Sequence, residues 1–245
     1  MSRFFVEPDQ VSHDGFITII GSDVKHMRDV LRMARGDTFI ACDSTGTEYN
    51  CELEAFLDGN AIGHVLAKRA GETEPLVPVT LLQGIPKGDK MELIIQKNIE
   101  LGVTAILPVM MERSVVRFKD DKDKDKKWER WNRIAMEASK QCGRLKVPQV
   151  HRPMTLKEAL ARLDPGGLRL VPYENEQDLR LKAVLRGQTV SSVSFLIGPE
   201  GGIAEAELTA LRESGFTSVS LGKRILRTET AGFAVLSAIR YELED

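Results

Sequence analysis

Hydrophobic and polar residues alternate over short distances in the first seventy residues, which is the pattern of β-strands rather than of helices. Turn-forming stretches such as 44–46 and 58–60 separate the apolar runs. The expected strands cover residues 3–6, 15–20, 38–42, 48–56 and 61–67. Several short strands in so small a region predict a small β-barrel.

Residues 22–33 interrupt this pattern with helical spacing, and Ser22 is placed to cap the start of a helix. The apolar residues that recur at this spacing are Val24, Met27, Val30 and Leu31. The opposite face is basic and carries Lys25, His26, Arg28 and Arg32, with Arg35 just beyond. This basic face could be an ordinary solvated surface or a patch that contacts phosphates.

The pattern changes after residues 71–78, which are polar and then proline-rich and are typical of a linker. Strand-like and helix-like runs alternate from there on, which predicts an α/β domain with a parallel sheet. The expected strands are 79–83, 104–109, 168–173 and 192–197, and the expected helices are 89–101, 128–142, 155–163, 178–185 and 230–243. An alternating Lys/Asp run at 119–127 predicts a solvated loop. We therefore expect two domains, 1–73 and 74–245.

The last helix, 230–243, is apolar around nearly its whole circumference, which predicts burial on all sides. In a domain of this size such a helix indicates a subunit interface.

Charge and cysteine content narrow the class of protein. The formal net charge is −2, and residues 1–73 hold 7 Lys/Arg against 12 Asp/Glu, a local charge of −5. Any contact with nucleic acid must therefore come from local patches. The three cysteines form no CxxC pair, and no apolar run has the length of a membrane span. We expect a soluble cytoplasmic protein without a metal site.

Two glycine-bearing stretches, 198–202 and 221–230, each follow a strand-like run and open a helix-like one. This layout predicts a ligand site at the carboxyl ends of parallel strands. A phosphate cradle is disfavoured, because the first loop carries Glu200 and has no Lys-Ser/Thr pair. A ligand with an apolar, hydrogen-bonding end and a positive charge fits better, and S-adenosylmethionine is one such ligand.

The same stretches carry a family resemblance. Phe195-Leu196-Ile197-Gly198-Pro199-Glu200-Gly201-Gly202 and Leu221-Gly222-Lys223-Arg224-Ile225-Leu226-Arg227-Thr228-Glu229-Thr230-Ala231 resemble the cofactor motifs of SPOUT methyltransferases. Further motifs at 87–92, 112–114, 137–142, 3–5 and 26–32 extend the resemblance over the whole chain to the RsmE family, which methylates N3 of a uridine in small-subunit (16S) ribosomal RNA. The resemblance implies a PUA-like amino-terminal barrel, a trefoil-knotted α/β domain, and a homodimer with active sites at its interface.

The resemblance also implies roles for individual residues. The cofactor would be enclosed by Leu196, Ile197, Gly198, Pro199, Glu200, Gly201, Gly202, Leu221, Gly222, Ile225, Leu226, Thr230 and Ala231. The uridine would be oriented or stabilised by Arg113, Arg227 and Glu229. RNA would be contacted by Arg3, Lys25, His26, Arg28, Arg32, Lys87 and Lys90. As alternatives without a catalytic role, Arg227 and Glu229 could pair with each other or cap the last helix.

Three other functions stay open on the sequence. The chain could be a non-catalytic RNA-binding or ribosome-assembly protein that uses the barrel alone. It could be a SPOUT methyltransferase that acts on another RNA nucleotide. A nucleotide-dependent enzyme with an ordinary doubly wound fold is disfavoured by Glu200 and by the missing Lys-Ser/Thr pair.

Overall fold

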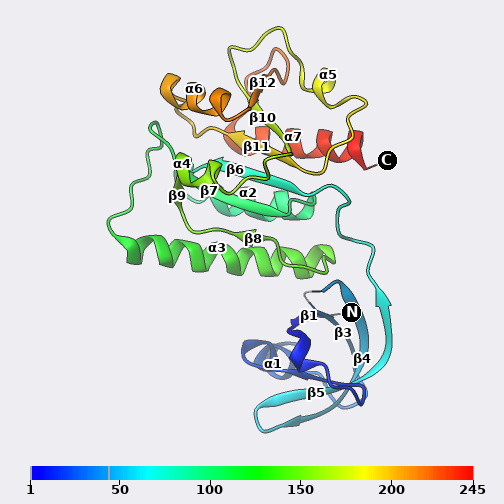
Figure 1. Cartoon of the computed structure of the whole chain (residues 1–245). Coiled ribbons are helices and arrows are strands. Elements are labelled where there is room, and N and C mark those ends of the chain that lie inside the picture. Colours follow the sequence, from blue (N-terminus) through cyan, green and yellow to red (C-terminus); the bar gives the residue numbers. More distant parts are fainter. Residues whose placement is uncertain (1, 44, 245) are drawn as a thin grey trace. The chain divides into compact units, whose positions relative to one another are not determined.

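The computed structural model describes residues 2–43 and 45–244. It forms two compact units (Figure 1). The first runs to Glu74 and also includes Ser139–Val147, and the second comprises Pro75–Ala138 and the chain from Pro148 onward.

The first unit is built on a five-stranded sheet with the order β1-β3-β4-β5-β2. Its strands are β1 (Arg3–Val6), β2 (Phe16–Ile19), β3 (Thr38–Asp43), β4 (Thr47–Leu57) and β5 (Asn60–Ala70), and a short helix η1 (Pro8–Gln10) follows β1. The edge strands β1 and β2 come back into contact, so the sheet curls around a core that includes Phe4, Ile17 and Phe39. All five strands expected from the alternating pattern are confirmed. Ser44, which begins one of the expected turns, lies outside the described residues.

The predicted helix at 22–33 is only partly correct. It consists of α1 (Ser22–Lys25) followed by a wide π-helical turn, η2 (His26–Val30), in which the Leu31 N–H donates to the His26 carbonyl. Val24 and Met27 are buried as their spacing suggests, whereas Val30 is 65% exposed, because the wider turn rotates later residues off the apolar face. Ser22 is not the cap, since Gly21 holds that position.

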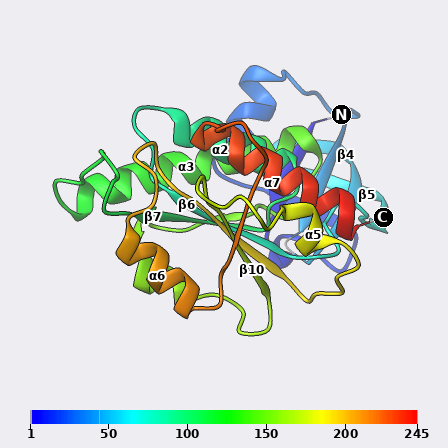
Figure 2. The same ribbon diagram turned by 90° about the horizontal axis from the view of Figure 1, so that it is seen from above.

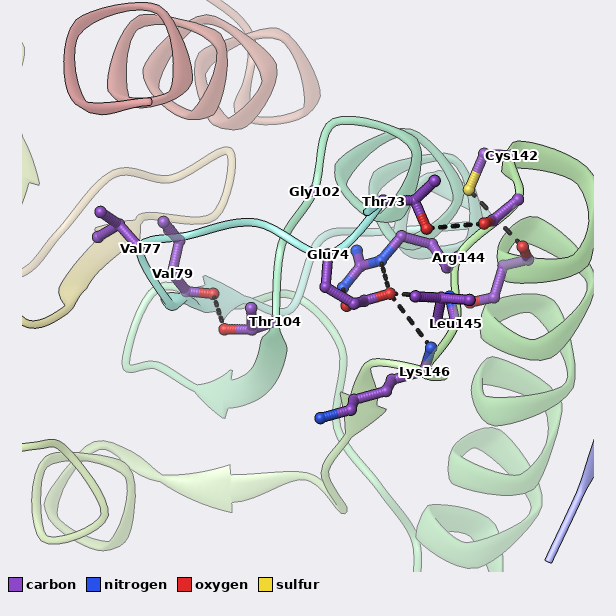
Figure 3. A network of polar contacts seen from close by, with 12 residues as sticks. Thr73, Glu74, Val77, Val79, Gly102, Thr104, Cys142, Arg144, Leu145 and Lys146 are labelled. Atoms are coloured by element: carbon purple, nitrogen blue, oxygen red, sulfur yellow. Dashed lines mark hydrogen bonds and ion pairs between the residues drawn. The ribbon is translucent and has the colours of Figure 1, made fainter. Parts of the chain in front are cut away.

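The Ser139–Val147 segment joins the first unit through a partly buried ion pair. The Arg144 guanidinium donates to both carboxylate oxygens of Glu74, from Nε at 3.0 Å and from Nη2 at 2.6 Å (Figure 3). The Leu145 and Lys146 N–H groups donate to the same carboxylate, and the Thr73 hydroxyl donates to the Gly143 carbonyl. Burial raises the pKa of Glu74, but these hydrogen bonds outweigh it and leave the pKa below its ordinary value.

The second unit is built on a parallel sheet with the order β12-β10-β11-β6-β7-β8. Its strands are β6 (Val79–Gly84), β7 (Ala105–Met110), β8 (Gln149–Val150), β9 (Met154–Thr155, paired with β7), β10 (Leu168–Pro172), β11 (Val193–Ile197) and β12 (Thr217–Val219). Its helices are α2 (Lys90–Glu100), α4 (Leu156–Leu160), α5 (Leu181–Leu185), α6 (Glu205–Glu213) and α7 (Thr228–Leu243). The expected parallel α/β arrangement is confirmed.

Helices cover both faces of this sheet. Residues of α4 and α6 pack with Leu82, Leu107 and Leu196 in one apolar cluster. The neighbouring side chains along each strand point to the opposite face, where α2 packs against α7; Figure 2 shows α6 on one side of the sheet and α2 and α7 on the other. Within α2 the residues expected to face inward, Met91, Ile94, Ile95 and Ile99, are all buried, and Gly102 follows the helix with a left-handed backbone.

The Lys/Asp run predicted as a loop is instead the start of α3 (Asp121–Cys142). Asp120 caps this helix, because its carboxylate accepts the Asp123 N–H at 2.8 Å. Arg152 pairs with Asp125 at 2.6 Å and with Asp121 at 3.3 Å. The charges that looked like a solvated loop therefore support the first turns of a helix.

Candidate functional site

The strand order places a topological switch point between β6 and β11. These strands are neighbours in the sheet, yet α2 follows β6 on one face and α6 follows β11 on the other. The chain therefore leaves the two strands in opposite directions, and their carboxyl ends border a crevice of the kind in which open α/β sheets bind ligands. A Cβ atom on Gly84, at the end of β6, would lie 2.7 Å from the Pro199 nitrogen, so the two strand ends are tightly packed.

The first glycine loop follows β11 and packs against the loop that follows β7. A Cβ atom on Gly201 would lie 2.9 Å from the Arg113 carbonyl oxygen and 2.9 Å from Arg113 Cβ, so only glycine fits there. Gly202 has a φ of 75° and closes a turn by donating its N–H to the Pro199 carbonyl at 2.9 Å. The loop thus brings to the switch point main-chain atoms that carry no side chain of their own at positions 201 and 202.

Leu196 and Ile197, which were assigned to the cofactor site, are the last residues of β11 and are buried in the core. Within this single chain their side chains serve packing, so a ligand at the switch point would meet mainly their backbone. Glu200 lies in the loop and bonds to the segment that follows β6, through the Lys87 N–H at 3.3 Å and Lys90 Nζ at 2.8 Å.

The second glycine loop connects β12 to α7. Gly222 has a φ of 106°, and its N–H donates to the Ser220 hydroxyl at 3.3 Å. Leu221 and Leu226 are half-buried, whereas Ile225 is 88% exposed. An isoleucine this exposed has an apolar surface that a ligand or a second subunit could cover. Of the two assigned residues in the first turn of α7, Thr230 is exposed and Ala231 is buried.

The three residues assigned to the uridine all border these loops. Arg113 Nη1 donates to the Gly201 carbonyl at 3.4 Å. Arg227 is the N-cap residue of α7, with an exposed side chain that makes no capping hydrogen bond. Glu229, in the first turn of α7, has a side chain only 15% exposed and forms an ion pair with Lys90 at 3.5 Å. The suggested partner of Glu229 was Arg227, and the structure gives it Lys90 instead.

Lys90 therefore holds two carboxylates at the switch point, those of Glu200 and Glu229. Its hydrogen bond to Glu200 raises the pKa of Lys90. Burial raises the pKa of Glu200, but the hydrogen bonds from Lys90 and from backbone N–H groups leave that pKa below its ordinary value. Lys87 is exposed, whereas Lys90, which was assigned to RNA, is engaged within the site.

The remaining residues assigned to RNA lie in the first unit. Lys25, His26, Arg28 and Arg32 are exposed on or next to α1 and η2, and Arg28 pairs with its neighbour Asp29. Arg3 differs from them, because its side chain is 12% exposed and its guanidinium donates to Glu48 and to Cys42 Sγ. In this structure Arg3 therefore makes internal contacts of the barrel and is not part of its exposed basic surface.

Two further residues at the switch point, Glu207 and Gln83, lie outside the motifs identified in the sequence. Glu207 of α6 accepts the Glu112 and Ala204 N–H groups, at 2.8 and 3.0 Å, and so joins the loop after β7 to the start of α6. Gln83 in β6 donates to Thr228 of α7. The available signal for Gln83 was a large polar side chain near the end of a mostly apolar strand.

Across residues 2–43 and 45–244, no group of three or more His, Cys, Asp or Glu side chains could hold a metal ion. No helix in the described part of the chain is long and apolar enough to cross a membrane.

Comparisons with known proteins agree with this geometry. Residues 72–240 match the RNA methyltransferase domain family, and residues 19–60 match an RNA methyltransferase PUA domain. The chain is 38% identical to ribosomal RNA small subunit methyltransferase E of Bacillus subtilis, with 100% of this chain and 98% of the relative covered.

Solved structures give the same answer. A ribosomal RNA small subunit methyltransferase E from Neisseria gonorrhoeae, bound to S-adenosyl methionine, matches with a TM-score of 0.87 and 33% identity over 99% of this chain and 98% of that one. A putative methyltransferase from Legionella pneumophila, also with bound cofactor, matches with a TM-score of 0.85 and 28% identity over 98% and 96% of the two chains. The chain therefore belongs to the RNA methyltransferase family, among the relatives named ribosomal RNA small subunit methyltransferase E.

Proposed function

We propose that this protein transfers a methyl group from S-adenosylmethionine to N3 of one uridine in small-subunit (16S) ribosomal RNA. The observation that carries the proposal is the full-length similarity to a ribosomal RNA small subunit methyltransferase E bound to that cofactor. The cofactor would lie at the switch point, where Gly201 and Gly202 leave main-chain groups accessible and Leu221, Ile225 and Leu226 supply apolar surface. S-adenosylmethionine supplies an electrophilic methyl group, and the protein must orient the acceptor toward it.

Methylation of uridine at N3 requires loss of the N3 proton, and the negative charge then spreads onto the two ring oxygens. Cationic groups near these oxygens stabilise that charge. Arg113 and Arg227 border the glycine loops and are suited to this role, and Glu229 would orient the base. Because N3 lies on the Watson–Crick edge, the target uridine must be unpaired or extruded from its helix.

We assign the methyl-transfer site to the domain at 74–245, which would carry the trefoil knot of the SPOUT fold, and RNA contact to the barrel at 1–73. Supporting the second assignment, the exposed basic residues of α1 and η2 are grouped on one short segment. Since ribosomal RNA is the proposed substrate, we also place the protein in the cytoplasm.

The barrel assignment predicts a change in the salt dependence of RNA binding. Replacing Arg28 and Arg32 together with alanine should weaken binding to small-subunit RNA and flatten the plot of log affinity against log salt by about 0.7 to 0.9 per lost phosphate contact. Filter binding across a salt series measures the slope. The Arg69→Ala variant is the comparison, because it also removes an exposed arginine of the first unit, but from β5 and not from the segment of α1 and η2. An unchanged slope in the double variant would remove this segment from the RNA surface.

We further propose a homodimer formed through α7. One face of α7 is buried within the chain, by Ala231, Val235, Leu236 and Ile239 among others. Burial on all sides was expected, but the opposite face is open: Ala234 and Ser237 are exposed, and Tyr241 is 76% exposed. A second copy would cover this face and explain its composition.

Accordingly, Tyr241→Glu should convert the dimer to a monomer, because a charged side chain would be buried at the interface without a partner. Sedimentation velocity measures the change. Glu242→Lys on the same helix turn controls for altered charge. A Tyr241→Glu variant that sediments like the wild type would exclude this face from the interface.

Mapping of ribosomal RNA modifications in a deletion strain tests the function itself. The small-subunit RNA should lose one methylated uridine, and the gene supplied in trans should restore it. A binding or assembly protein without catalytic activity would leave every methylated position occupied. A methyltransferase for another nucleotide would remove a modification other than methyluridine.

A further inference from the structure

Gln83 is a fully buried amide that joins three segments beneath the two glycine loops. It is 0% exposed, and its Nε2 donates to Thr228 Oγ1 at 3.0 Å and to the Gly84 carbonyl at 3.0 Å. Thr228 Oγ1 in turn donates to the Gly198 carbonyl at 2.7 Å. Through one hydroxyl group, Gln83 therefore connects the end of β6 to the first residue of α7 and to the start of the first glycine loop.

The direction of the hydrogen bonds in this relay follows from the number of hydrogens that each group can donate. A threonine hydroxyl has a single hydrogen to donate, and a carbonyl oxygen can only accept. Because the Thr228 hydrogen is used on the Gly198 carbonyl, the contact with Gln83 requires that Gln83 donate. The reversed amide would place two acceptors in competition for one hydrogen, so the relay itself determines the orientation of the amide.

The buried Gln83 amide contributes more to the position of the glycine loop than to the stability of the folded protein. Gln83 Oε1 is buried and has no hydrogen-bond partner among the described residues, which costs free energy. An apolar side chain of similar shape would avoid that cost but would leave the Gly84 carbonyl without its Gln83 donor, so the two effects oppose each other and the net change in folding stability should be small. What the amide supplies, and an apolar side chain cannot, is the donor that holds Thr228 in place against Gly198.

We infer that Gln83 is a positioning residue for the cofactor: through Thr228 it fixes the Gly198 carbonyl and the first turn of α7, which carry the two sides of the S-adenosylmethionine site. This inference rests on the proposed function. It assigns to Gln83 a role in the site without direct contact with the reacting atoms, and it predicts that cofactor affinity and folding stability respond differently to its replacement.

Calorimetric titration of S-adenosylmethionine tests the relay. Gln83→Met and Thr228→Val should each raise the Kd by about tenfold, the equivalent of one buried hydrogen bond. The double variant should lose no more than either single one, because both changes break the same chain of bonds. Thr228→Ser should recover most of the binding that Thr228→Val loses, and Gln83→Met should unfold at nearly the wild-type temperature.

Asn98 provides a matched control in the same unit. It is also a fully buried amide whose oxygen has no hydrogen-bond partner in the described part of the chain, but its Nδ2 bonds within its own helix, to the Ile94 carbonyl at 2.7 Å. Asn98→Ala should lower the unfolding temperature and leave the Kd unchanged. Wild-type affinity in Gln83→Met, losses that multiply in the double variant, or an equal loss in Asn98→Ala would overturn the inference. A wild-type protein that binds no S-adenosylmethionine would overturn the proposed function and this inference with it.

Discussion

Gly201→Val should lower kcat/KM for S-adenosylmethionine by on the order of a hundredfold, the cost of displacing a site by about an ångström. The first atom of a side chain at position 201 would lie 2.9 Å from the Arg113 carbonyl oxygen. Backbone cannot rotate away as the end of a flexible side chain can, so the loop after β11 or the loop after β7 must move. The first movement displaces the cofactor loop and the second displaces Arg113, so either one disturbs the site.

Initial-rate kinetics with labelled cofactor measure this effect, and circular dichroism checks that the variant is folded. Gly166→Val is the matched control, because the nearest neighbour of a Cβ atom there is Asp164 Oδ1 at 3.8 Å, an ordinary contact. The control should keep wild-type kinetics. A Gly201→Val enzyme with normal kcat/KM would show that the cofactor does not use this loop.

Arg144→Met should lower the free energy of unfolding of the first unit by about 3 kcal/mol, because it leaves the Glu74 carboxylate largely buried with only backbone donors. The arginine side chain is 4% exposed, and it bonds to both oxygens of that carboxylate. Chemical denaturation followed by a probe in the barrel measures the loss. Arg28→Ala breaks an exposed ion pair and should leave the stability close to that of the wild type.

The same ion pair predicts a pH dependence. The pKa of Glu74 is lowered in the folded state, so its stabilisation is fully present above the ordinary pKa of 4.5 and is lost as the pH falls through the lowered value. The difference in stability between the wild type and Glu74→Gln should therefore shrink on acidification below about pH 4.5. A difference that stays constant to lower pH would show that the pair does not hold the Ser139–Val147 segment.

Local patterns were sufficient for the elements whose stabilisation is local. The apolar spacing in α2 and the left-handed Gly102 that follows it give the helix almost residue for residue, and the capping box of Thr155 and Glu158 marks the start of α4. The start of α3 was missed because Arg152, which pairs with its first turns, lies far along the chain. The alternation of Lys and Asp along this run does not reveal an ion-pair partner that lies elsewhere in the sequence.

At the site, too, features set by local backbone geometry could be predicted, and features set by distant contacts could not. Glycine loops can be read from sequence, because a left-handed φ at Gly202 and the close approach at Gly201 restrict those positions to glycine. Gln83 and Glu207 act on residues more than ninety positions away, which only the parallel pairing of the strands brings near. Similarly, Arg3 looked like a surface cation until the fold placed it against Glu48.

The most direct test of the central claim is the identity of the methylated nucleoside. Purified protein is incubated with methyl-labelled S-adenosylmethionine and small-subunit RNA from the deletion strain, and the RNA is digested and analysed by mass spectrometry. The account predicts label in 3-methyluridine at a single position. Absence of label from the RNA, or label in a different nucleoside, would contradict it.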